Sequence, residues 1–445
     1  MSAADSPARP ASDAAAPARA AGPDAGPPEG AALKTSGASA PGAPAGGAAT
    51  SSGVPALAVA ALSFAAFLSG TSLRLTDALL PRLGGEFGMD LAQVARVVTL
   101  FAVAYGVAQL LFGPLGDRFG KYRVVAWACV ASVLTTLSCA LAPGFQTLAL
   151  GRLLAGATTA AIIPLSMAWI GDNVPYEQRQ PVLARFLLGQ ILGVSAGVWL
   201  GGFAADHLSW RTPFVLIAAC FALASVLLFW QHRRLRPQAP VASEAQGFVV
   251  ARMAREFGQV LAKPWARVVL LAVFLEGACL YGVFAFVATH LHHTFGLSLS
   301  TAGSMVMLFG FGGVLYAVAS PWLVPRLGEV GLIRVGGVLM AVSLGLVALA
   351  PLWWWAMPAC FVTGLGFYMM HNTLQINATQ MAPERRGAAV SAFASCFFMG
   401  QALGVATAGR LVAQWGSAQV MLAGATGVLG VSLLFAWRRA RRGPA

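Results

Sequence analysis

Charged residues are scarce in this chain. It has 29 lysines and arginines and 16 aspartates and glutamates among 445 residues, whereas 58% of the residues are hydrophobic. A soluble protein of this length needs a charged shell around its core. The composition therefore excludes a soluble globular fold and indicates a membrane protein.

Two further shortages argue against particular chemistries. The cysteines lie in apolar stretches without Cys-x-x-Cys spacing, which argues against a disulfide framework and against zinc. A Gly-x-x-x-x-Gly-Lys-Ser/Thr loop is also missing, so we expect no nucleotide-driven motor. We expect neither an enzyme nor a bound cofactor. The six cysteines are Cys129, Cys139, Cys220, Cys279, Cys360 and Cys396.

Apolar stretches of about 20 residues recur from Leu57 almost to the C-terminus, and each is long enough to cross roughly 30 Å of hydrocarbon as a helix. We therefore predict an all-α integral membrane protein with twelve transmembrane helices in two pseudo-symmetric six-helix bundles. The predicted spans are 57–80, 92–114, 124–142, 146–169, 181–203, 211–231, 268–290, 299–322, 331–350, 355–380, 388–411 and 418–437.

The remaining segments are polar or basic. Residues 1–53 are rich in Ala, Pro and Gly and are expected to form a disordered tail without a signal peptide. Between the bundles, Phe248 to Leu261 has the apolar spacing of an amphipathic helix on the membrane surface, although a solvated linker explains it equally well. The predicted domains are the tail 1–53, the bundles 54–231 and 268–437, the basic linker 232–267 and the basic tail 438–445.

The basic residues fall in alternate loops, which fixes the expected orientation. Loops rich in Lys and Arg stay on the cytoplasmic side, so we place both termini in the cytoplasm and the chain in the inner membrane. The net charge of +13 is then a topology signal and not a nucleic-acid surface. The expected partners are the lipid bilayer, a small-molecule substrate and protons, and we expect a monomer.

The two halves resemble each other. Pro175, Glu177 and Arg179 follow the fourth span, and Pro383, Glu384 and Arg386 follow the tenth span at matching spacing. Such repeats are typical of transporters, which bind substrate near the membrane midplane between them.

The loop after the second span reads GPLGDRFGKYR and closely matches a signature of the major facilitator superfamily. The fourth span adds an Arg-x-x-x-Gly pattern, Arg152 and Gly156, and the resemblance covers about Val54 to Arg439. It implies a conformational gate at the loop. The gate residues are Gly113, Asp117, Arg118, Gly120, Lys121 and Arg123. A weaker copy with Pro321, Arg326 and Gly328 follows the eighth span.

The fifth span resembles the antiporter motif GxxxGPxxGG of twelve-helix drug:proton antiporters, with Val198 in place of the proline. This resemblance implies proton-coupled efflux of small amphipathic organic compounds. A proton-coupled uptake symporter for a sugar or an organic acid is the alternative that Val198 keeps open, and a non-transporting membrane sensor is a third. The glycines of the motif are Gly193, Gly197, Gly201 and Gly202, and we read them as close-packing positions.

Three of the charged residues inside spans are candidates for coupling. Arg74 and Asp77 are three apart on one face of the first span, so an ion pair is expected. Asp77 either exchanges a proton or forms a permanent salt bridge that closes the outer side. Glu276 lies about 15 Å into the seventh span, where an acid handles protons or a cationic substrate, or else has only a packing role.

Polar residues in two other spans complete the candidate site. His371 and Gln375 share a helix face, and His371 either relays protons or makes an interhelical hydrogen bond. Tyr105 and Gln109 either line the pathway or join helices. His290, His292 and His293 have no carboxylate or cysteine near them in sequence, so we predict no metal site.

Overall fold

The computed structural model describes residues 56–234 and 249–442, all of whose regular elements are helical. The predicted N-terminal tail, residues 235–248 of the basic linker and the last three residues lie outside the described residues. The first half contains α1 (Ala56–Arg74), α2 (Leu80–Phe87), α3 (Leu91–Val94), α4 (Arg96–Phe119), α5 (Lys121–Ala140), α6 (Phe145–Thr159), α7 (Ile162–Asn173), α8 (Tyr176–His207) and α9 (Thr212–Arg234).

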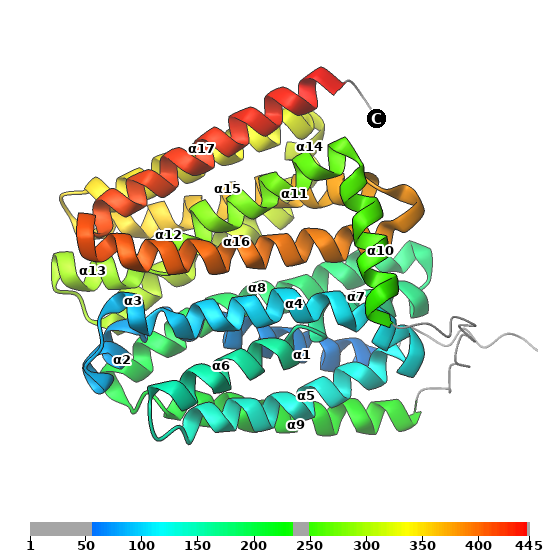
Figure 1. Cartoon of the computed structure of the whole chain (residues 1–445), viewed down its shortest axis with the longest axis horizontal. Helices are drawn as coiled ribbons and strands as arrows, with labels where there is room; N and C mark the ends of the chain where they lie inside the picture. The colour runs from blue at the N-terminus through cyan, green and yellow to red at the C-terminus, as the bar shows by residue number, and fades with distance from the viewer. Residues whose placement is uncertain (1–55, 235–248, 443–445) are drawn as a thin grey trace, which may run out of the picture. The chain divides into compact units, whose positions relative to one another are not determined.

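The second half contains α10 (Val249–Ala262), α11 (Pro264–Glu276), the π-helical turn η1 (Gly277–Tyr281), α12 (Gly282–Phe284), α13 (Val287–Phe295), α14 (Leu299–Leu349), the short η2 (Trp353–Trp355), α15 (Ala356–Gln380), the short η3 (Pro383–Arg385), α16 (Arg386–Trp415) and α17 (Ser417–Arg442). Figure 1 shows the long helices running side by side, with α10 lying across one end of them.

Ten stretches of the described residues are long and apolar enough to cross a membrane. One of them, α14, is 51 residues long and is interrupted at Gly328, whose φ of 60° is a left-handed conformation that breaks the helix. A further helix, α15, has 25 residues but is less apolar because it carries residues such as His371 and Gln375. The count is therefore compatible with the predicted twelve.

The break in α14 repeats a feature of the first half. Gly120, at the end of α4, has a φ of 88°, and Gly328 occupies the matching place in the weaker copy of the loop signature. Pro325 stands three residues before Gly328, where the first copy has Asp117. The two loops therefore share their backbone turn and differ in their charge.

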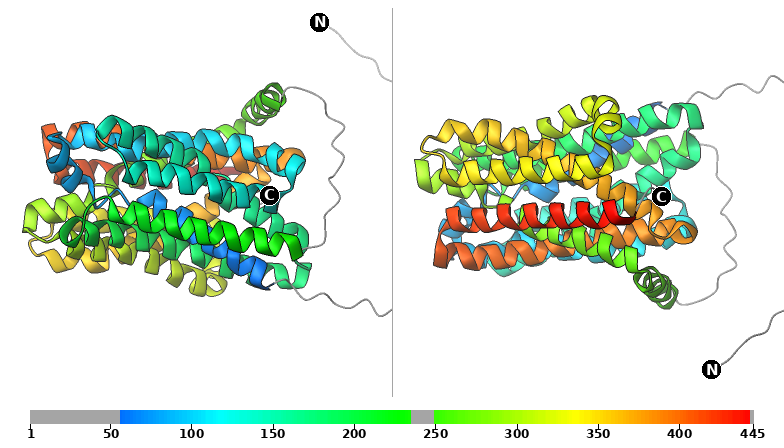
Figure 2. Two further views of the ribbon diagram at one scale, coloured as in Figure 1. Left: turned by 90° about the horizontal axis from the view of Figure 1, so that it is seen from below. Right: turned by 90° about the horizontal axis from the view of Figure 1, so that it is seen from above.

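The most extensive contacts between the halves run along two helix pairs, α4 with α16 and α8 with α14. Within the first half, α1 packs on α8 and α5 packs on α9, and within the second half α14 packs on α15 and α17. Figure 2 shows the helices of both halves from two further sides.

The helix ends differ from the predicted spans at one place that matters for function. The first predicted span continued to residue 80, but α1 ends at Arg74 and residues 75–79 form a turn before Pro81 opens α2. Asp77 therefore lies in this turn and not on a regular helix face. The turn lets its carboxylate fold back towards Arg74.

Candidate functional site

A buried acid and a histidine meet inside the second half. Glu276, the last residue of α11, is fully buried, and its Oε2 atom lies 2.8 Å from Nδ1 of His371 on α15. The His371 side chain is 17% exposed, so the histidine is the member of the pair that contacts solvent. The other carboxylate oxygen, Oε1, has no hydrogen-bond partner among the described residues. The pair can therefore accept one more proton or ligand donor.

Aromatic rings surround this pair. The ring of His371 stacks on Phe367 with centroids 4.8 Å apart, and it also packs against Phe393 and Phe397. Tyr281 packs against Phe367 and Phe397 from the η1 side, with centroids 5.2 Å and 5.4 Å away. We call these residues, Tyr281, Phe367, Phe393 and Phe397, the aromatic cluster. They place the acid in an apolar surrounding that favours flat apolar ligands.

The π-helical turn η1 links Glu276 to Tyr281. In a regular α-helix, residues five apart point about 140° away from each other. A π-helical turn has more residues per turn, so it brings two such residues closer to one face, and such turns are frequent at functional sites. Glu276 precedes η1 directly and Tyr281 ends it. The turn therefore presents the acid and the phenol ring towards the same region.

Arg74 and Asp77 form the expected ion pair, with Nη1 and Oδ2 2.8 Å apart and both side chains almost fully buried. The guanidinium carbon of Arg74 also lies 4.5 Å from the centre of the Tyr281 ring and 5.6 Å from that of Phe284. Arg74 belongs to the first half and both rings belong to the second. The pair therefore takes part in the contact between the halves.

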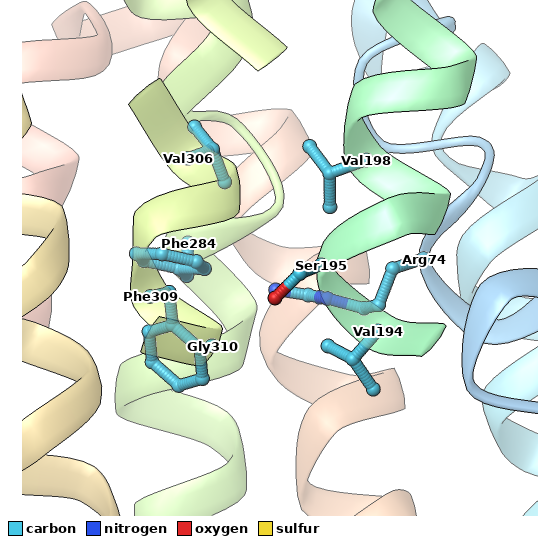
Figure 3. Close-up of a pocket in the computed structure, with 8 residues that line it drawn as sticks. All are labelled: Arg74, Val194, Ser195, Val198, Phe284, Val306, Phe309 and Gly310. Carbon is cyan, nitrogen blue, oxygen red and sulfur yellow. The ribbon is translucent and has the colours of Figure 1, made fainter. Parts of the chain in front are cut away.

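A small pocket, with room for about one water molecule, lies at this contact. Figure 3 shows Val194, Ser195 and Val198 of α8 facing Phe284 and Phe309, with the guanidinium of Arg74 directed between them. Ser195 Oγ and Arg74 Nε are buried and have no hydrogen-bond partner among the described residues. The pocket therefore offers two hydrogen-bonding groups in an apolar enclosure. Val198, which replaces the motif proline, forms part of its wall.

Arg152 of α6 holds the end of α1 in place. It is fully buried, its Nη1 donates a hydrogen bond of 2.9 Å to the carbonyl oxygen of Ser72, and its guanidinium carbon lies 4.1 Å from the centre of the Phe101 ring. A Cβ atom on Gly156 would overlap the Phe101 backbone. The Arg-x-x-x-Gly pattern thus packs α6 tightly against α1 and α4.

The glycines of the fifth-span motif are close-packing positions, as expected, and they bring α8 against α1 and α14. A Cβ atom on Gly193, Gly197 or Gly201 would overlap a carbonyl oxygen of α1 or of the turn that follows it, and one on Gly202 would overlap Leu299 at the start of α14. Only glycine allows backbones to approach this closely. The motif therefore fixes α8 against both halves.

The charged loop is organised around Lys121. Its Nζ atom lies 2.6 Å from Asp172 of α7 and 3.7 Å from Asp117. The Asp117 side chain is 65% exposed, and Arg118 and Arg123 are exposed as well. The ion pairs found here stay within the first half. Asp172 was not among the sequence candidates, because its spacing from the motif carries no recognisable pattern.

A second group that sequence reasoning missed joins the halves at the opposite end. The carboxylate of Asp206, near the end of α8, accepts hydrogen bonds from the backbone N–H groups of Leu299 and Ser300, at 3.3 Å and 2.6 Å. These N–H groups open α14, so Asp206 caps the first turn of a helix from the other half. Its position just beyond a predicted span gave no signal of this role.

Three candidate polar residues stand apart from the Glu276 pair. Tyr105 and Gln109 are buried on α4, and the Tyr105 ring packs on Phe398 of α16 with centroids 4.3 Å apart. Gln375 is partly buried, and no hydrogen bond joins it to His371 in the described part of the chain.

His290 and His292 of α13 have separate hydrogen-bond partners, and the ring centres of His292 and His293 lie 5.2 Å apart. His290 is hydrogen bonded to Ser417 and to the Val347 carbonyl oxygen, whereas His292 contacts the carbonyl oxygen of Leu297. Among residues 56–234 and 249–442, no three His, Cys, Asp or Glu side chains gather in a metal-binding group.

Comparison with known proteins decides the family. Residues 62–405 match the family model described as the Major Facilitator Superfamily. The chain belongs to this superfamily. It is therefore a multi-pass membrane transporter.

Relatives and solved structures agree with this assignment. The chain is 26% identical over 352 residues to the uncharacterized MFS-type transporter YceJ of Bacillus subtilis, covering 78% of this chain and 86% of that protein. It is 28% identical over 176 residues to the multidrug export protein EmrB of Escherichia coli K12, covering 40% of this chain and 34% of EmrB. Its fold is similar to a bacterial homologue of the human lysosomal transporter Spinster, with a TM-score of 0.70, 19% identity and coverage of 87% and 97%.

Proposed function

We propose that this transporter is proton-coupled, lies in the inner membrane with both termini in the cytoplasm, and exports small amphipathic organic compounds by alternating access. The observation that carries the proposal is the buried Glu276 paired with His371 inside the aromatic cluster. An acid at membrane depth is costly to keep unless it has a function.

The pair suits exchange of a proton for a ligand. His371 satisfies one oxygen of Glu276, whereas the other oxygen is without a partner in the described residues. A buried carboxylate needs a proton, a partner charge or hydrogen-bond donors to offset its loss of water. If a proton and a ligand compete for the same carboxylate, binding of one releases the other, which is the requirement for antiport.

The surroundings of the pair support an amphipathic substrate. Phe367, Phe393 and Phe397 provide apolar faces on which flat ligands stack, and the acid provides one polar anchor. The similarity to EmrB, which is named a multidrug export protein, supports the outward direction. The fifth-span glycine motif supports it as well.

The contacts between the halves support alternating access. Asp206 joins the halves near one end of the helices, through α14, and Arg74 joins them nearer the middle, through Tyr281. The ion pairs of Lys121, at the other end, stay within the first half. Movement of one half against the other would break the first set of contacts and leave the charged loop free to form new ones.

Uptake by proton symport is the second candidate, because one observation favours it. Val198 replaces the proline of the antiporter motif and lines the pocket beside Arg74, with 2% of its surface exposed. The kink that the proline would provide is therefore missing at the contact between the halves.

Transport in membrane vesicles of defined orientation tests the direction. Ethidium and Nile red serve as amphipathic probes, together with any compound that raises the thermal stability of the purified protein. With an imposed proton gradient, acid inside, we expect accumulation in inside-out vesicles that contain the protein and not in vesicles without it. Accumulation confined to right-side-out vesicles, driven by a gradient that is acid outside, would establish the symporter instead.

A further inference from the structure

A repeated pair of residues lies at one end of the helices. Trp230 and Arg234 of α9, Trp322 and Arg326 of α14, and Trp437 and Arg441 of α17 are each four residues apart, and in each pair the guanidinium carbon lies 3.8 to 3.9 Å from a ring centre of the tryptophan. The tryptophans are 41%, 58% and 42% exposed. Tryptophan and arginine at a helix end are typical of the boundary between membrane and water.

The end of α17 carries more charge than the other two. Arg438 also lies near the Trp437 ring, and Arg442 lies 4.6 Å from the centre of the Trp265 ring of α11. Trp265 in turn packs on Phe435 of α17, so α11 and α17 are joined here. Arginines from successive turns of α17 therefore gather beside two tryptophan rings.

One neighbouring arginine, Arg439, has its charge balanced by a carboxylate of the protein. Arg439 turns towards the protein, and its Nε donates to Oε2 of Glu329 on α14 at a distance of 2.8 Å. By contrast, Arg438, Arg441 and Arg442 are exposed, and none of them forms an ion pair with a carboxylate in the described residues. Three adjacent positive groups repel one another unless a counter-charge lies among them.

We propose that this group, Arg438, Arg441 and Arg442 with Trp437 and Trp265, binds the phosphate of an anionic phospholipid headgroup. Guanidinium groups match phosphate geometry with paired N–H donors, and stacking on the indole rings fixes their position at headgroup depth. The acyl chains then lie along the exposed apolar side chains of α17, such as Leu433 and Leu434, which are 46% and 56% exposed.

The occupant follows from charge and from position. Anionic lipids are concentrated where basic residues meet the membrane surface, and each basic group there changes the binding constant by about fivefold. Three arginines together therefore contribute on the order of a hundredfold to lipid affinity. The proposal does not depend on the direction of transport, and it holds for an exporter and an importer alike.

The test compares two triple variants of the full-length protein. Arg438, Arg441 and Arg442 are replaced by Gln in the first, and Arg233, Arg234 and Arg326 are replaced by Gln in the second. Both variants lose three positive charges, and the second includes two arginines stacked on tryptophan, so it is a matched control. Lipid binding is measured by native mass spectrometry after incubation with phosphatidylglycerol or phosphatidylcholine, and thermal stability is measured in nanodiscs of the same lipids.

We expect the wild type and the control to retain phosphatidylglycerol and to be more stable in its presence. The α17 variant should lose both effects while keeping the stability of the wild type in phosphatidylcholine. Equal retention by the α17 variant would overturn the proposal, and so would equal loss by both variants, which would indicate only a diffuse attraction. If inorganic phosphate at matched ionic strength gave the same stabilisation, the site would be a phosphate site and the lipid assignment would be wrong.

Discussion

Arg74 of the first half lies over the ring of Tyr281 of the second half, with its guanidinium carbon 4.5 Å from the ring centre. The same guanidinium group is paired with Asp77, and Tyr281 belongs to the π-helical turn that follows Glu276. The contact between the halves and the buried acid are therefore separated by a single helical turn. A movement of Tyr281 relative to Arg74 would therefore also displace Glu276.

Replacement of Tyr281 tests the contribution of this contact. A desolvated cation–π contact is worth about 2 kcal/mol. We expect Tyr281→Phe, which keeps the ring, to retain stability, and Tyr281→Leu to lose about 2 kcal/mol because Arg74 is left buried without the ring. Unfolding in detergent micelles measures the difference. Equal stability of the two variants would show that the ring does not hold Arg74.

Asp206 should control the closed state at the end of the helices where it caps α14. Asparagine has only one acceptor oxygen where the two carboxylate oxygens of Asp206 each accept a backbone hydrogen bond, so we expect Asp206→Asn to lose one of these bonds, about 1 kcal/mol. The population should then shift towards a state in which the halves are apart at this end. Spin labels at Gly85→Cys and Gln414→Cys, in a cysteine-depleted background, report the distance between the halves.

A matched control exists for this variant. Asp90 caps α3 within the first half, accepting a hydrogen bond of 2.7 Å from the backbone of Gln93. Asp90→Asn should therefore leave the distance distribution unchanged. A longer component that is equally present with Asp90→Asn, or missing with Asp206→Asn, would remove Asp206 from the closing contact.

Much of the architecture could be predicted because it depends on residues that are close together in the sequence. Apolar length predicted the helices, the loop signature marked the break between the second and third spans, and a spacing of three residues predicted the Arg74–Asp77 pair. The end of α1 was predicted wrongly, because residues 75–79 are apolar enough to continue a span although Arg152 holds the chain in a turn there.

The contacts that combine these parts could not be predicted. Glu276 and His371 were each candidates, but they are separated by 95 residues, and no local pattern shows that they meet. No residue pattern distinguishes the π-helical turn from an α-helix. The sequence around Asp206 also does not distinguish it from other acids at the ends of spans. Pairing across helices depends on packing of the whole bundle, which a single sequence does not display.

The close approach of α8 and α1 gives a prediction about stability. A methyl group on Gly197 would overlap the carbonyl oxygen of Thr71, so we expect Gly197→Ala to destabilise the protein by about 1 to 3 kcal/mol. Gly171→Ala in α7 is the control, because nothing lies within 4 Å of its added Cβ atom. Thermal unfolding of both variants tests this prediction. Equal unfolding midpoints would show that α8 can move away from α1 without loss of stability.

The charged loop should matter for turnover and little for folding. Asp117 is largely exposed and Lys121 keeps its closer partner Asp172, so we expect Asp117→Asn to change the free energy of unfolding by less than about 1 kcal/mol. We also expect it to reduce transport to near background, because the loop must latch one conformation. A full transport rate in the double variant Asp117→Asn and Arg118→Ala would contradict the assignment of the loop as a gate.

The central claim is that Glu276 carries the coupled proton. Glutamine preserves the shape of the side chain and its hydrogen bond to His371 but cannot titrate. The measurement is proton movement, followed with a trapped pH-sensitive dye, when a stabilising compound is added to proteoliposomes. Glu86→Gln is the control, because Glu86 is an exposed acid whose nearest basic partner, Arg211, lies 3.8 Å away.

We expect proton release with the wild type and Glu86→Gln, and none with Glu276→Gln, although the same compound should still raise the thermal stability of that variant. Asp77→Asn should release protons as the wild type does. Normal proton movement in Glu276→Gln would contradict the account, and its loss in Asp77→Asn alone would transfer the role to the Arg74–Asp77 pair.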